Sequence, residues 1–199
     1  MMHFNNLLFI GKQMKSAKEA FITGKKVFLR PVQEEDESMI ARIENHPDAR
    51  ETLFYALPTS LRQQREKITK HADDPTTILL IICRKEDHTA IGQTAFFRID
   101  WVGRMATFYL GIADKENWAK GYGSETTALM LDYAFQTLNL NRVQLHVALE
   151  NKGAVKVYQR NGFQIEGTLR EAMYHRGHYS DFYVMGILKA DWLQNINNQ

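Results

Sequence analysis

The feature that most constrains the fold is a run of three apolar segments joined by short polar turns. The segments lie at 78–84, 90–99 and 105–112, and the turns at 86–88 and 101–104. Turns this short join antiparallel neighbours, because two parallel strands need a crossover connection of a dozen residues or more. The run therefore predicts three consecutive antiparallel strands.

The segments on either side add helices and further strands. Ser60 and Gln63 form a capping-box pattern that predicts the start of a helix. Val143, Leu145 and Val147 alternate with polar residues, as in a strand with one buried face. Besides the three strands, the expected elements are strand 26–31, a helix from Asp36 or Ser38 to about 45, helices 60–72, 124–138 and 151–160, and strands 142–148, 163–166 and 181–188. This order predicts a mixed α/β sheet and excludes a doubly wound Rossmann sheet.

Composition indicates one globular domain with short appended ends. The chain has 199 residues and a formal net charge of +2, from 25 basic and 23 acidic side chains. Cys83 is the single cysteine, so an internal disulfide is excluded. We expect an N-terminal arm at 1–25, with a short helix near 14–22, a main domain at 26–191 and a C-terminal tail at 192–199.

Several classes of protein are disfavoured by the same numbers. No apolar stretch approaches the ~20 residues of a membrane helix, so we expect a cytoplasmic protein with no membrane partner. The small net charge and the lack of a long basic run give no reason to expect a nucleic-acid partner. His175 and His178 lack the spacing of a zinc-binding helix pair, and we expect no metal.

The segment 117–125 is the first candidate site. It follows a predicted strand, contains Gly121 and Gly123, and precedes a predicted helix that begins near Ser124. Backbone N–H groups in such a loop converge on an oxyanion, and the helix N-terminus adds about half a positive charge. The loop is neither a Walker loop nor the three-glycine dinucleotide pattern. From spacing alone, an ordinary tight turn remains an equally good interpretation.

A second candidate site lies about thirty residues further on. Asn151, Ala154 and Tyr158 fall on one side of a short predicted helix that ends at Asn161-Gly162. A tyrosine hydroxyl there could donate a proton to a leaving group. The more common role of such a residue is a half-buried tyrosine whose hydroxyl is merely hydrogen-bonded.

Taken together and in this order, the segments resemble the GNAT family of N-acetyltransferases, and most closely its ribosomal-protein-alanine and polyamine acetyltransferase branch. The resemblance covers about residues 26–191. The matching motifs are Leu29-Arg30-Pro31, Trp118-Ala119-Lys120-Gly121-Tyr122-Gly123-Ser124-Glu125, Glu150-Asn151, Gly162-Phe163, Glu166-Gly167-Thr168-Leu169-Arg170 and Gly177-His178-Tyr179-Ser180-Asp181.

The resemblance implies a central, mostly antiparallel sheet that splays at an acetyl-CoA cleft and is flanked by helices. It implies acetyl-CoA as the donor, an amine as the acceptor, and direct attack of the amine on the thioester. Tyr158 would act as general acid on the leaving sulfur. The residues implied to contact acetyl-CoA are Leu110, Gly111, Ile112, Trp118, Ala119, Lys120, Gly121, Tyr122, Gly123, Ser124, Asn151 and Ala154.

One departure from the family pattern concerns the general base. Many members have a glutamate on the strand before the loop, and the matching residue here is Thr107, which cannot act as a base at neutral pH. We select His146 from the candidates because it lies on the polar face of the strand that borders the cleft, although a surface histidine is the more common case. The other candidates are Glu150, Glu171, His175, His178 and Asp181.

The acceptor stays open between a protein N-terminus and a small amine such as a polyamine or an aminoglycoside. Acidic residues that could attract a polyamine occur in 34–74, although such charges more commonly form a solvated face: Glu34, Glu35, Asp36, Glu37, Glu44, Asp48 and Glu51. A non-catalytic acetyl-CoA-binding module and a nucleotide-binding domain are the rival classes. The apolar strand 182–188 suits a homodimer interface and a core strand equally.

Overall fold

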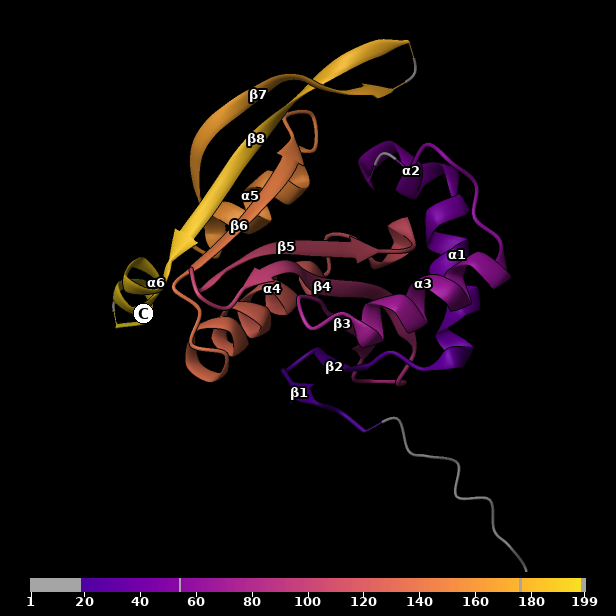
Figure 1. Ribbon diagram of the computed structural model, residues 1–199, viewed down its shortest axis with the longest axis horizontal. Helices are drawn as coiled ribbons and strands as arrows, with labels where there is room; N and C mark the ends of the chain where they lie inside the picture. Colours follow the sequence, from indigo (N-terminus) through magenta and orange to yellow (C-terminus); the bar gives the residue numbers. More distant parts are fainter. Residues whose placement is uncertain (1–18, 54, 176, 198–199) are drawn as a thin grey trace, which may run out of the picture.

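The structure is a computed structural model that describes residues 19–53, 55–175 and 177–197. Within these residues the strands form one eight-stranded sheet in the order β1-β2-β3-β4-β5-β6-β8-β7 (Figure 1). The strands are β1 (Ile22–Thr23), β2 (Val27–Pro31), β3 (Ile78–Arg84), β4 (Ala90–Asp100), β5 (Met105–Ile112), β6 (Arg142–Ala148), β7 (Gln164–His175) and β8 (His178–Leu188). This confirms the predicted mixed α/β sheet, including its three central antiparallel strands.

Helices cover both faces of the sheet. They are α1 (Glu37–Asn45), α2 (Pro47–Leu53), α3 (Leu61–Asp73), α4 (Tyr122–Asp132), α5 (Lys152–Arg160) and α6 (Lys189–Asn197). On one face, Ile40 of α1 and Ile68 of α3 pack on Phe28, Ile81 and Cys83. On the other face, α4 and α5 cover the larger core. We call these the α1–α3 face and the α4–α5 face.

One neighbouring pair in the sheet is parallel. β5 pairs with β6 only from Met105↔Arg142 to Thr107↔Gln144, whereas β6 continues beside β8 through Ala148↔Phe182. The two parallel strands therefore separate beyond Thr107, and Figure 1 shows β5 and β6 diverging. This is the splay that the family resemblance implied.

Several predicted boundaries differ from the structure for local reasons. Pro47 lies just beyond the predicted helix, as expected, but it is also the first residue of α2, a helix that was not predicted, where its missing N–H costs nothing. Asp36 caps no N–H of α1 with its side chain, because its carboxylate binds Arg30 instead. The β7–β8 hairpin is much longer than predicted. Most of β7 is exposed, so its sequence lacks the alternation of apolar and polar residues that would have predicted a strand.

The two ends of the chain also differ from the expected arm and tail. Residues 22–23 of the arm form β1 and pair with β2, while most of the helix expected near 14–22 lies outside the described residues. At the C-terminus, α6 crosses the predicted boundary at 192, because Trp192 is buried against Phe135. No helix among the described residues is long and apolar enough to span a membrane.

Candidate functional site

The opening between β5 and β6 exposes one edge of β5. Ala113 donates its N–H to the Ile91 carbonyl of β4. In an antiparallel pair every second residue hydrogen-bonds to the neighbouring strand, so the peptide groups of Leu110 and Ile112 point away from β4, toward the opening. The indole of Trp118 donates to the Ile112 carbonyl at 3.2 Å. The peptide groups of Gly111 face β4 instead, which corrects the expectation that all three residues present backbone groups to a ligand.

The glycine loop leads from this opening to the N-terminus of α4. Gly121 is the N-cap, with φ at +88°, and Ala119 also has a positive φ of +58°. A side chain is strained at such a φ, and Gly121 has none to cover the first N–H groups of the helix. The helix starts at Tyr122, two residues before the predicted start. The loop has the open helix N-terminus that an oxyanion requires.

Contacts from the β1–β2 turn hold the loop from behind. The carboxylate of Glu125 accepts hydrogen bonds from the backbone N–H groups of Lys25 and Lys26, the latter at 2.9 Å. The Lys26 ammonium donates to the Lys120 carbonyl at 2.9 Å. Glu125 is therefore engaged away from the helix N-terminus. No local pattern predicted this contact, which joins residues one hundred positions apart.

Several loop side chains are used within the protein rather than toward a ligand. The Tyr122 ring is buried in the core of the α4–α5 face. The Ser124 hydroxyl accepts a hydrogen bond from Asn161 at the end of α5, at 3.1 Å. Gly123 contacts no backbone closely and would leave room for a methyl group. At Tyr122 and Ser124, the loop thus offers backbone groups to a ligand.

The second predicted cluster is formed on α5, beside α4. Asn151 is the N-cap, and its side-chain oxygen accepts from the Ala154 N–H at 3.1 Å. Tyr158 is 7% exposed and packs edge-on against Phe108 and Phe163. Burial raises the pKa of the Tyr158 phenol, and the nearby Tyr109 adds to the effect. The hydroxyl is therefore protonated at neutral pH and able to donate.

Comparison with known proteins identifies the family in which this arrangement occurs. Residues 26–164 match the family model of the acetyltransferase (GNAT) domain. The chain belongs to the GNAT acetyltransferase family. This confirms the resemblance seen in the sequence and the GNAT fold inferred from it.

Individual GNAT proteins are similar along most of the chain. Spermidine N(1)-acetyltransferase of Vibrio cholerae serotype O1 is 31% identical over 165 residues, which is 83% of this chain and 94% of that protein. The putative ribosomal N-acetyltransferase YdaF of Bacillus subtilis is 33% identical over 106 residues, 53% of this chain and 57% of YdaF.

Solved structures of the Vibrio cholerae enzyme have the same fold. Its complex with CoA and spermine has a TM-score of 0.80 and 29% identity, covering 85% of this chain and 99% of that one. A structure of the same enzyme described as dodecameric has a TM-score of 0.75 and 29% identity, covering 86% and 99%.

The candidate base lies on the other face of the GNAT sheet from the candidate acid. Val143, Leu145 and Val147 of β6 face α4 and α5, so His146 faces the α1–α3 side, where it is exposed. Thr107 pairs with Gln144 at the last step before the strands separate. His146 therefore borders the opening, while Tyr158 approaches from the opposite face.

Three of the carboxylates considered for binding a polyamine already have cationic partners. Asp36 forms a fully buried, two-pronged ion pair with Arg30, at 2.7 Å for each contact. Glu37 pairs with Arg65 at 2.8 Å and Glu44 pairs with Lys67 at 2.7 Å. Among the described residues, no group of three His, Cys, Asp or Glu side chains gathers as a metal site would require.

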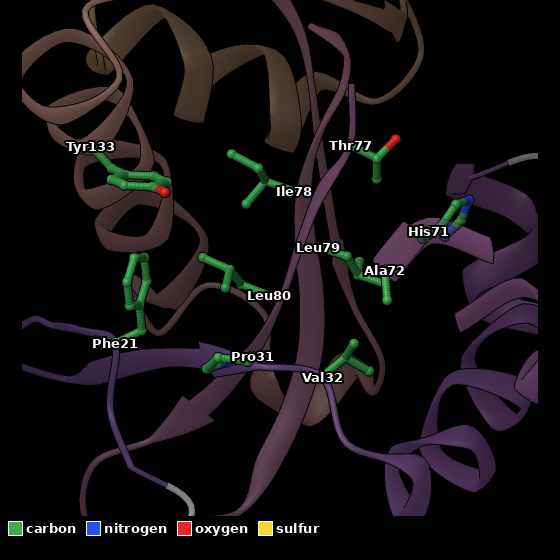
Figure 2. Close-up of a pocket in the computed structure, with 10 residues that line it drawn as sticks. All are labelled: Phe21, Pro31, Val32, His71, Ala72, Thr77, Ile78, Leu79, Leu80 and Tyr133. Atoms are coloured by element: carbon green, nitrogen blue, oxygen red, sulfur yellow. The ribbon is translucent and has the colours of Figure 1, made fainter. Parts of the chain in front are cut away.

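A cavity of about 330 Å³ lies elsewhere, at the edge of β3 that extends past the end of β2 (Figure 2). Figure 2 shows Phe21 and Tyr133 on one side of β3 and His71 with Ala72 on the other. The cavity is lined by none of the predicted site residues. It is therefore separate from the opening between β5 and β6.

Sequence analysis missed a polar cluster on the α1–α3 face of the opening. The Tyr55 hydroxyl, just after α2, lies 2.5 Å from the Tyr109 hydroxyl of β5. Gln93 of β4 is 6% exposed and lies near both phenols. Each residue comes from a different element, so no spacing rule could group them.

Proposed function

We propose that this protein transfers the acetyl group of acetyl-CoA to a primary amine by direct attack of the amine on the thioester. The observation that carries the proposal is the separation of β5 from β6 next to the open N-terminus of α4. An extended donor with an anionic end requires both features, an unpaired strand edge and a cluster of N–H groups.

The residues of the opening fit acetyl-CoA. We assign the pyrophosphate to the backbone of residues 118–124 and the exposed charge of Lys120. The peptide groups of Leu110 and Ile112 suit the pantetheine arm, and Asn151 and Ala154 border its path from α5. Acetyl-CoA supplies the activated thioester carbon, and the protein supplies alignment and protons.

The reaction needs one group that accepts a proton and one that donates a proton, and we assign them to residues on opposite faces of the sheet. The amine must lose its ammonium proton before it attacks, and the departing thiolate must gain a proton. Tyr158, protonated and buried beside Phe108, suits the second role. We assign the first role to His146 or to water beside it, because this imidazole is exposed at the border of the opening.

For the acceptor, we propose a small polyamine of the spermidine class. The support is the similarity to spermidine N(1)-acetyltransferase over 94% of that protein and the fold shared with its complex with CoA and spermine. A protein N-terminus is the second candidate, because YdaF, a putative ribosomal N-acetyltransferase, matches about half of this chain.

We also propose that the protein forms an oligomer, as the dodecameric Vibrio cholerae structure suggests. The predicted interface strand 182–188 lies in β8, between β6 and β7, and its Met185 and Ile187 are buried in the core. Its apolar character is therefore already explained, and the free edge of the sheet at this end is β7.

The deciding experiment measures thiol release from acetyl-CoA with a panel of amines. The panel contains spermidine, spermine, an aminoglycoside, free amino acids and peptides beginning with Ser, Ala or Met. Turnover with polyamines supports the first acceptor class, and turnover with peptides alone replaces it with the second. If no amine reacts while acetyl-CoA still raises the melting temperature, the chain is either a binding module or an enzyme for an amine outside the panel.

A further inference from the structure

The Tyr55–Tyr109 pair lies on the side from which an amine can enter. Phe108 contacts Tyr158 on the α4–α5 face, so the next residue of β5, Tyr109, points to the α1–α3 face. Its hydroxyl is 2.5 Å from that of Tyr55, in the segment that follows α2. The donor-binding loop and the candidate acid lie on the other face, so this pair belongs to the acceptor half of the opening.

The Tyr109 hydroxyl lies directly over Gly111. A Cβ atom added at Gly111 would come within 2.5 Å of the Tyr109 oxygen and within 3.3 Å of a Leu53 methyl group. Position 111 therefore has to lack a side chain for the phenol to occupy this place. Gly111 lies beyond the last β5–β6 pair, between the two residues whose peptide groups face the opening.

Both phenols keep their protons across the physiological pH range. Burial raises the pKa of Tyr55 and of Tyr109, and the negative charge of Glu44 adds to each effect. One of the two hydroxyls donates its proton in a hydrogen bond to the oxygen of the other. The oxygens retain lone pairs that accept hydrogen bonds, but a neutral phenol is too weak a base to deprotonate an ammonium group.

We propose that the Tyr109 hydroxyl accepts a hydrogen bond from an N–H of the neutral attacking amine, and that Tyr55 is a positioning residue that fixes this hydroxyl over Gly111. The proposal rests on the proposed function and adds an acceptor-binding group to it. In the reaction the new C–N bond forms, the C–S bond breaks, and one amine proton leaves while the thiolate gains one. Tyr109 neither gains nor loses a proton.

The arrangement has a consequence for specificity. A bound primary amine retains an N–H for Tyr109 and a second hydrogen to lose on acylation, whereas its nitrogen lone pair must face the thioester. A buried acceptor left without its N–H partner is costly, so compounds that lack the N–H are disfavoured. The pair thus selects the nucleophile through alignment and hydrogen bonding rather than through charge.

The test compares Tyr109→Phe and Tyr55→Phe with the wild type, using the most reactive amine of the panel. We expect kcat/KM for the amine to fall about tenfold in Tyr109→Phe and about threefold in Tyr55→Phe, typical of a lost neutral hydrogen bond. The double variant should lose no more than Tyr109→Phe alone, since Tyr55 acts through Tyr109. The dissociation constant of acetyl-CoA should not change.

Tyr133→Phe is the matched control. Tyr133 is also partly buried, and burial raises the pKa of its phenol, but it lies beside Phe21 at the separate cavity. It should retain wild-type kinetics. The shape of the pH profile should be the same in Tyr109→Phe and wild type, because the phenol does not titrate. A changed acidic limb would instead make Tyr109 a base and overturn the assignment.

A binding measurement separates this proposal from the proposed function. Calorimetry of spermidine with the protein saturated with CoA should show weaker binding in Tyr109→Phe than in wild type, whether or not turnover occurs. Equal kcat/KM and equal amine affinity in a folded Tyr109→Phe variant contradict the proposal. A wild-type protein without turnover contradicts the proposed function alone, provided that this difference in amine binding remains.

Discussion

The proposed donor half and the proposed acceptor half of the opening are built in different ways. The proposed donor half consists of the loop 117–124 and the start of α5, two short continuous segments that offer mainly backbone N–H groups. The proposed acceptor half joins Tyr55, Gln93 and Tyr109, which come from three separate segments and offer side chains. Backbone sites impose a local glycine pattern, whereas side-chain clusters assembled by the fold leave no pattern along the chain.

The two halves also differ in what stabilises them. The donor loop rests on exposed contacts with the β1–β2 turn, such as the bond from Lys26 to Lys120. The proposed acceptor half lies beside Leu53 of α2, and on the same face of the sheet the Arg30–Asp36 pair is fully buried. Substitutions in the donor half should therefore change activity more than stability, and substitutions of the buried pair should do the reverse.

The largest effect should come from Tyr158→Phe. Removing the hydroxyl leaves the ring packing with Phe108 and Phe163 intact but removes the proposed proton donor. We expect kcat to fall about 100-fold or more, as for loss of a general acid, with little change in melting temperature. Because burial raises the pKa of Tyr158, it stays protonated and the loss should be similar from pH 6 to 9. Rates equal to wild type throughout that range would remove Tyr158 from the mechanism.

Next in size is Asp36→Ala, which tests stability. The change leaves the guanidinium of Arg30, 1% exposed, without its carboxylate. Loss of one partner of a buried pair costs about 3–5 kcal/mol of unfolding free energy, measurable by urea denaturation. Glu66→Ala breaks the exposed Arg62–Glu66 pair and is the control, with an expected cost below about 0.5 kcal/mol. Similar losses of unfolding free energy in the two variants would show that the buried Arg30–Asp36 pair stabilises the fold no more than the exposed pair does.

Gly121→Asp should weaken acetyl-CoA binding by about 100-fold. A side chain at φ +88° costs about 1–2 kcal/mol, and a carboxylate repels the phosphates at the helix N-terminus. Gly177→Asp is matched in charge and backbone strain, with φ at +86°, but lies at the tip of the β7–β8 hairpin. It should keep wild-type affinity. Unaltered donor binding in Gly121→Asp, measured by calorimetry, would exclude the loop as the phosphate site.

The smallest effect concerns His71, which packs against Phe97 on the α1–α3 face. Burial lowers the pKa of His71, and Lys67 and Lys70 lower it further, against the opposing charges of Asp74 and Glu44. The folded state thus binds fewer protons than the unfolded state, and stability falls as pH drops below about 6.5. His71→Gln should reduce the loss of melting temperature between pH 7 and 5 by at most about 2 °C. An identical pH dependence in both proteins would contradict the assignment.

Local chemistry explains where sequence reasoning succeeded. Strands 78–84 and 105–112 have the predicted bounds, because their apolar residues alternate between two covered faces. Ser60 and Gln63 form the predicted capping box, and Gly162 has the left-handed φ of +91° expected after a helix. Each of these features depends on residues within a few positions of one another.

Contacts and burial set by the tertiary structure explain where it failed. Asp36 looked like a helix cap, but the buried Arg30 takes its carboxylate. Residues from 192 onward looked like a tail, yet Trp192 is covered by Phe135 on the end of the helical segment that follows α4. For Trp192 the deciding partner lies far outside the window in which a sequence pattern operates. Arg30 is only six positions from Asp36, but its need for a partner comes from its burial in the folded protein.

By itself, the sequence determined the mixed sheet, its central antiparallel strands and the glycine-containing loop before α4, because hydrophobic periodicity, capping and glycine conformation are local properties. Only the tertiary structure decided at which residue β5 and β6 separate, that Gly111 turns its peptide groups to β4, and that Tyr109 lies above it against Tyr55. These outcomes depend on which strand edges pair and on which side chains meet across the sheet, and both are set by packing among residues distant in the chain.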